Sequence, residues 1–147
     1  MTIWRSIGAV MLGIIVAYSV VTALEILGVI LFPLPPGTDP TNEEQIRKLL
    51  EEDKIPAGAL ACVFSAWVVG AFCGSWVAAR LTSSAPLFCG WIVGCCIFLG
   101  SLMMLFELPH PYGFAFAALL FVPVASWFGA ALGAKQQSGG KAASPAA

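Results

Sequence analysis

The sequence predicts an all-α integral membrane protein, a four-helix bundle with a short amphipathic helix in its first connecting loop. Three observations lead to this fold class. Of the 147 residues, 59% are hydrophobic and only 10% are charged, and the mean hydropathy is +0.90, whereas a soluble domain carries about 25% charged residues. The apolar residues gather in four nearly uncharged runs, each long enough to cross a hydrocarbon core of about 30 Å. Proline-rich or polar segments separate the runs.

The four spans are expected at residues 3–32, 56–81, 86–108 and 113–134. The proline-rich residues 33–37 end the first span, because proline cannot continue a helix. Pro56 favours the first turn of the second span, and the prolines within 109–111 end the third. We expect residues 1–134 to form a single membrane domain. The Gly/Ser/Ala-rich residues 135–147 are predicted to be a disordered tail.

The first apolar run also has some features of a cleavable signal peptide. Arg5 precedes it, and residues 21–23 resemble a small-residue cleavage site. However, the apolar stretch resumes at Ile26 and continues to Phe32, so it exceeds the 7–15 residues, roughly, of a signal-peptide core. We therefore expect an uncleaved first span, with cleavage as the disfavoured alternative.

The polar segment between the first two spans predicts a helix over residues 40–53. Asp39-Pro40 and the capping box at 41–44 both resemble helix starts. Four pairs of opposite charge at i,i+4 favour the helix: Glu43 with Arg47, Glu44 with Lys48, Arg47 with Glu51, and Lys48 with Glu52. Its narrow apolar stripe of Ile46, Leu49 and Leu50 indicates a position on the membrane surface or over the mouth of the bundle. A solvated connector and a ligand-gating lid both fit this pattern.

The Lys and Arg residues near the span ends indicate the orientation. One side would hold Arg5, Arg80, Lys135 and Lys141, and the other would hold Arg47, Lys48 and Lys54. This margin is narrow, but Arg5 precedes the first span, and Trp4, Trp76 and Trp91 lie near the ends on the same side. We expect both termini in the cytoplasm.

Every span carries small residues at four-residue spacing, a pattern that lets helices in a membrane approach closely. The glycines expected to take part in helix packing are Gly13, Gly70, Gly74, Gly90, Gly94, Gly129 and Gly133. Their presence in all four spans argues for a tight bundle or for an oligomer, and leaves both open.

Two acidic residues, Glu25 and Glu107, lie within hydrophobic segments, where ionisable groups are candidates for a functional role. Glu25 lies 20 residues after Arg5, and Glu107 lies 21 residues after Pro86. Each count corresponds to about 30 Å of helix, so both carboxylates are expected at the same membrane interface. His110 follows three residues after Glu107. The three residues are either separate interfacial groups or one polar site that binds a cation or relays protons.

No motif in the sequence specifies a reaction. A single histidine leaves few ways to build a nucleophile–base pair, so we expect no catalytic residues and lean against an enzyme. No cofactor is expected, and a metal is left open.

The number of cysteines is odd, and none of them forms a C-x-x-C pair. This pattern favours packing roles over disulfides or zinc for all five: Cys62, Cys73, Cys89, Cys95 and Cys96. A net charge of −1 gives no basic field for nucleic acid.

Four short features run along most of the chain: Glu25 late in the first span, Pro-Pro-Gly at 35–37, a Gly-rich stretch from Gly70 to Arg80, and Pro-His-Pro at 109–111. In this layout the chain resembles a class of small, uncharacterised four-helix bacterial inner-membrane proteins. The resemblance implies a bacterial inner membrane and no assigned activity.

The function predicted from these features is that of a non-enzymatic accessory or oligomeric membrane component. Its partners would be the lipid bilayer and a homo-oligomer or a larger membrane complex. The alternative is a small transporter or channel whose polar site is formed by Glu25, Glu107 and His110.

Overall fold

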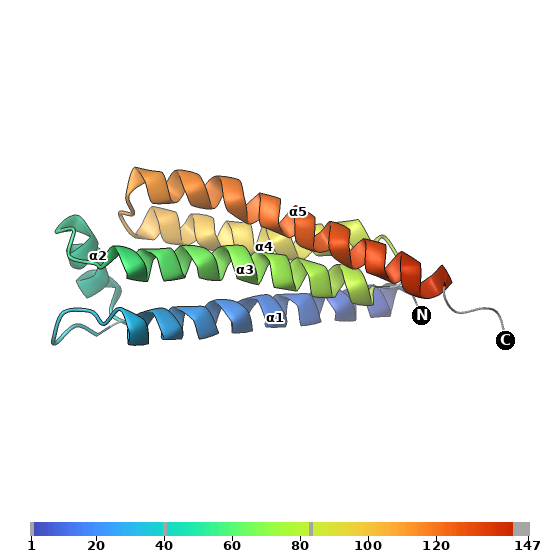
Figure 1. Cartoon of the computed structure of the whole chain (residues 1–147), viewed down its shortest axis with the longest axis horizontal. Helices are drawn as coiled ribbons and strands as arrows, with labels where there is room; N and C mark the ends of the chain where they lie inside the picture. Colours follow the sequence, from blue (N-terminus) through green and yellow to red (C-terminus); the bar gives the residue numbers. More distant parts are fainter. Residues whose placement is uncertain (1, 40, 83, 143–147) are drawn as a thin grey trace.

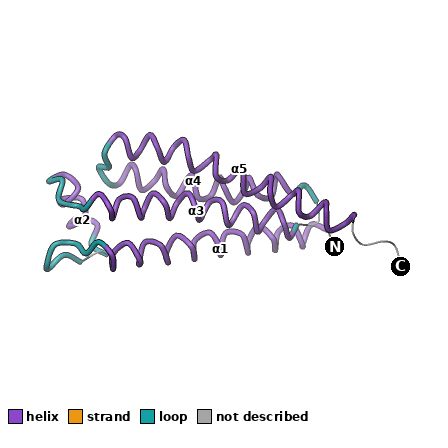
Figure 2. The backbone as a smooth tube through the Cα atoms, in the orientation of Figure 1, coloured by secondary structure: helices purple, strands orange, loops and turns teal. Residues whose placement is uncertain are grey.

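The computed structural model describes residues 2–39, 41–82 and 84–142, and the described part of the chain forms five helices. These are α1 (Thr2–Leu31), α2 (Glu43–Glu51), α3 (Ala57–Leu81), α4 (Pro86–Glu107) and α5 (Tyr112–Ala142). The four long helices run side by side and α2 lies at one end (Figure 1, Figure 2). Each long helix is long and apolar enough to cross a membrane. The predicted all-α membrane bundle with a short loop helix is therefore confirmed.

The helix α5 continues beyond its predicted end at Ala134. Residues 135–142 are helical instead of disordered, while residues 143–147 lie outside the described part of the chain. Contacts with the end of α3 explain the extension. The Trp76 indole N–H donates to Gln136 Oε1 at 3.0 Å, and the Gln137 side-chain amide donates to the Thr82 carbonyl.

Helix α3 is the centre of the bundle, because it packs against α1, α4 and α5. Helix α4 also packs against α5 and, less extensively, against α1. Most of the buried side chains on α3 are small; they include Ala66, Ala71, Ala78 and Ser75. Small side chains let helix backbones approach closely, which is the main way apolar helices associate in lipid.

The contact between α1 and α3 shows how close this approach is. A methyl group added at Gly74 would lie 2.6 Å from Ala17 Cβ and 2.6 Å from the Gly13 carbonyl oxygen. Added at Gly70, it would lie 2.6 Å from Val21 Cγ2 and 3.0 Å from the Ala17 carbonyl oxygen. Contacts under 3.0 Å are essentially never made by a real Cβ, so these positions require glycine at the present helix spacing.

The other predicted packing glycines lie at the contacts of α5 with α3 and α4. Each faces a residue of the neighbouring helix: Gly90 faces Ala130, Gly94 faces Ser126, Gly129 faces Phe72, and Gly133 faces Trp76. All seven glycines identified from the sequence thus face another helix of the same chain. Their role within the bundle needs no second copy.

The start of α2 differs from the predicted capping box. The N-cap residue is Asn42, whose side chain accepts from the Gln45 backbone N–H at 3.1 Å, so the helix begins one residue later than a Thr41 cap would give. Thr41 instead donates to Asp39 Oδ1 through its hydroxyl at 2.7 Å and its backbone N–H at 2.9 Å. These bonds hold the pKa of the Asp39 carboxyl below its usual range. Pro40 lies outside the described residues.

Candidate functional site

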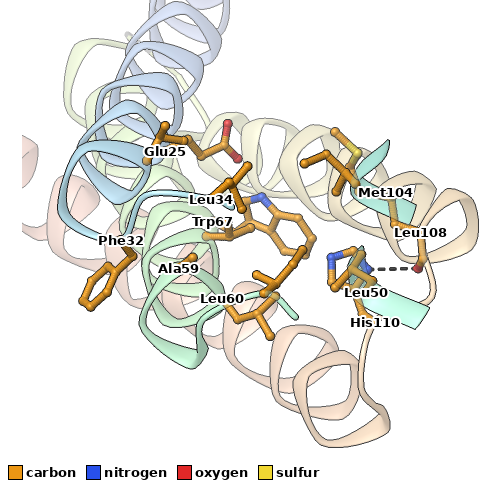
Figure 3. A pocket seen from close by; sticks show the side chains of 14 residues that line it. Glu25, Phe32, Leu34, Leu50, Ala59, Leu60, Trp67, Met104, Leu108 and His110 are labelled. Carbon is orange, nitrogen blue, oxygen red and sulfur yellow. Dashed lines mark hydrogen bonds between the residues drawn. The ribbon is translucent and has the colours of Figure 1, made fainter. Parts of the chain in front are cut away.

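A cavity of about 220 Å³ lies at the end of the bundle that carries α2. Its lining comes from the end of α1 and the loop after it, from α2, from the start of α3, and from the end of α4 with the turn that follows (Figure 3). Three of the fourteen lining residues carry polar side-chain groups, namely Glu25, Trp67 and His110. The other eleven are aliphatic, methionine or phenylalanine residues. The cavity is therefore apolar, with a few polar groups in fixed positions, as is usual for small-molecule sites.

Helical spacing explains how α2 and α3 present these side chains. Leu60, Val63 and Trp67 lie at i, i+3 and i+7 on α3, which places them on one face. Ile46 and Leu50 lie one turn apart on α2 and cover the cavity from outside. The loop helix thus lies over the mouth of the bundle, which is one of its two predicted positions (Figure 1).

Glu25 lies six residues before the end of α1, or about 9 Å from that end at 1.5 Å per residue. Its side chain is half-buried and points into the cavity toward α3 (Figure 3). The indole nitrogen of Trp67 points toward the carboxylate (Figure 3). The carboxylate is thus near the mouth of the bundle, with an aromatic ring beside it.

His110 lies across the cavity, in the turn between α4 and α5. Its Nδ1 is 3.0 Å from the Leu108 carbonyl oxygen, and because a carbonyl can only accept, Nδ1 carries the proton. The ring stacks on Phe114 with centroids 4.8 Å apart. Burial lowers the pKa of His110, although the hydrogen bond to the Leu108 backbone opposes this effect. The imidazole is therefore neutral at pH 7, and its other ring nitrogen, on the side that faces Trp67, can accept a hydrogen bond (Figure 3).

Glu107 lies apart from these two residues. Its side chain is exposed and borders a neighbouring hollow together with Glu43 and Ile46. Its backbone carbonyl accepts a hydrogen bond from Arg47 Nη2 at 2.7 Å. This bond satisfies a carbonyl of the last turn of α4 and places a cation at the negative end of the helix. Glu25 and His110 thus line one cavity, whereas the backbone carbonyl of Glu107 binds Arg47 of α2.

Among the described residues, no group of three or more His, Cys, Asp and Glu side chains is placed to hold a metal ion. The arrangement can instead hold a molecule with an apolar body. Glu25 would accept hydrogen bonds from its polar group, and His110 could accept one from the other side.

Trp67 is the site residue that sequence reasoning missed. The signal was present in the apolar spacing of Leu60, Val63 and Trp67, which marks one face of the second span. Nothing in the sequence pairs that face with Glu25, because 42 positions and a loop helix separate the two residues.

No protein-family model, curated protein or solved structure matches this chain. The architecture established by the sequence and the structure is that of a membrane protein with four helices able to span the bilayer.

Proposed function

We propose that this chain is a non-enzymatic membrane component that binds a small amphiphilic molecule in the cavity beneath α2. The observation that carries the proposal is the cavity itself, with eleven apolar lining residues around one carboxylate and one neutral imidazole. An apolar lining with a few oriented polar groups fixes both the position and the orientation of a ligand.

The contacts of α2 support reversible access to this cavity. None of the nine residues of α2, all of them described, is buried. Ile46 and Leu50 cover the cavity, and Arg47 ties the helix to the end of α4 through one charge-assisted hydrogen bond. A segment with so little buried surface opens at a low free-energy cost.

The proposal extends to the placement of the protein in the cell. We place it in a bacterial inner membrane with both termini in the cytoplasm, on the Lys/Arg distribution and the resemblance noted above. The start of α1 and the end of α5 lie at the same end of the bundle (Figure 1), which is consistent with both termini on one side. The cavity would then open near the external interface.

Filling the cavity tests the binding function. Ala59 lines the cavity and Ala57, in the first turn of the same helix, is exposed and does not. Saturation-transfer NMR with 1-hexanol and hexylammonium would compare the full chain in phosphatidylcholine nanodiscs with empty nanodiscs. We expect at least one probe to bind the native protein and the Ala57→Trp variant, and not the Ala59→Trp variant. Binding of neither probe to the native protein, or equal binding to both variants, would refute the proposal.

Transport is the second candidate, and the carboxylate of Glu25 in an apolar cavity is the observation that favours it. Ionisable residues within spans commonly mark ion or substrate pathways. Flux of hexylammonium into liposomes would support transport if Glu25→Gln abolished it. Binding without flux would leave the protein as a binding component.

A further inference from the structure

We infer that the ligand of this cavity is a singly charged organic cation with a short apolar chain, held between the Glu25 carboxylate and the Trp67 indole. The inference rests on the proposed binding function and adds the charge and the orientation of the ligand.

The charges of the lining favour a cation. Glu25 and His110 are the ionisable residues among the fourteen described lining residues, and His110 is neutral at pH 7. The ionised Glu25 carboxylate would therefore be the single charge among these lining residues. Arg47 follows Ile46 on the covering helix, but it is not part of the lining. Its guanidinium donates to the Glu107 carbonyl instead. An anionic ligand would be repelled, and a neutral one would leave the half-buried carboxylate without a compensating charge.

The aromatic groups position the cation. The Trp67 indole presents its N–H edge to the Glu25 carboxylate (Figure 3), so a cation on the remaining acceptor positions of the carboxylate would lie beside the ring. Trp67 packs in turn against Phe114 with ring centroids 5.5 Å apart and against His110 at 6.2 Å. These contacts fix the indole in place, so the cation would meet a preformed carboxylate–aromatic pair.

The apolar part of the ligand would extend beneath α2. The cavity that holds Glu25 is also lined by Leu60 at the start of α3 and by the covering residues Ile46 and Leu50 of α2. A cavity of about 220 Å³ suits a short alkyl or single-ring chain and is below the 300–1,000 Å³, roughly, of sites for drug-sized ligands. The cationic group would thus lie against α1 and the chain beneath α2.

Three probes with the same six-carbon chain test the charge: hexylammonium, 1-hexanol and hexanoate. Their affinities would be measured at neutral pH for the full chain in phosphatidylcholine nanodiscs, with empty nanodiscs subtracted. We expect hexylammonium to bind best, by about tenfold or more over 1-hexanol, since a hydrogen bond to a charged group contributes about tenfold to hundredfold in affinity.

Two matched variants test whether the Glu25 carboxylate causes the preference for hexylammonium. Glu25→Gln keeps the shape and removes the charge, so the preference for hexylammonium is expected to vanish. Glu107→Gln removes a carboxylate at the same end of the bundle but outside this cavity, and the preference is expected to persist. Circular dichroism would establish that both variants keep the helical fold.

The outcomes separate the inference from the function on which it rests. If 1-hexanol binds as well as hexylammonium and Ala59→Trp abolishes both, the binding function stands and the cation inference is overturned. If the preference survives in Glu25→Gln, the inference is also overturned. If no probe binds, the binding function fails and the inference fails with it.

Discussion

Replacing Gly13 with alanine tests whether the close approach of α1 to α3 stabilises the bundle. Gly8 provides a matched control in the same helix, because a methyl group there would have nothing within 4 Å. Both substitutions exchange the same two residues inside α1. The gain in helix propensity is therefore the same for both, and the difference between them isolates the helix contact.

The magnitude follows from the geometry. A Cβ at position 13 would lie 2.7 Å from the Gly74 carbonyl oxygen and 2.9 Å from Ala78 Cβ. Ordinary contacts begin at 3.4 Å, and the backbone oxygen cannot rotate away, so α1 and α3 would have to separate by about 0.7 Å. A gap of about 0.5–1 Å forfeits about a quarter to a half of each dispersion contact across an interface. Overpacking typically costs about 1–3 kcal/mol, and alanine returns up to about 1 kcal/mol through helix propensity.

We therefore expect Gly13→Ala to lower the free energy of unfolding by about 1–2 kcal/mol. Gly8→Ala is expected to leave it unchanged or raise it slightly. Titration of the purified protein from mild detergent into sodium dodecyl sulfate, followed by circular dichroism, would measure both. Equal midpoints for the two variants would refute the reasoning that the α1–α3 contact depends on glycine at position 13.

Three further predictions concern α2, His110 and the orientation. Arg47→Ala should speed amide hydrogen exchange across α2 (Glu43–Glu51), because it removes the bond to the Glu107 carbonyl. Lys48→Ala should leave the exchange unchanged, since Lys48 pairs with an exposed residue of its own helix. Burial lowers the pKa of His110 below its ordinary 6.5, so the unfolded chain binds more protons than the folded one as the pH falls through this value. The free energy of unfolding should therefore decrease below about pH 6.5, and the decrease should be smaller in His110→Gln. Reporter fusions at either terminus should indicate a cytoplasmic location.

Each of these three predictions has an opposing result. Equal exchange in the Arg47→Ala and Lys48→Ala variants would show that the bond to α4 does not hold α2. An unfolding free energy with the same pH dependence in the native protein and His110→Gln would assign the titration to another group. A reporter active only outside the cytoplasm would reverse the orientation and place the cavity at the cytoplasmic interface.

The sequence by itself determined the membrane class and the four spans. Long apolar runs must form helices in lipid because every backbone polar group has to be satisfied within the segment. Prolines follow the first and third spans and set where the connections after these two spans begin. The spans are accordingly close to their predicted bounds. Residues 135–142 are helical although a disordered tail was predicted, because Gln136 and Gln137 contact the end of α3. The composition of the tail gives no information about these contacts.

The candidate site was determined only in part by the sequence. Depth along a helix follows from counting residues, so the placement of Glu25 near one end of the bundle follows from the sequence alone. Rotation about the helix axis and the choice of neighbouring helix depend on packing. Only the tertiary structure placed Trp67 beside Glu25, separated Glu107 from them, and directed Arg47 to α4 rather than to the acidic residues of its own helix. It also decided that the glycines join helices of one chain, because the facing backbones come from distant parts of the sequence.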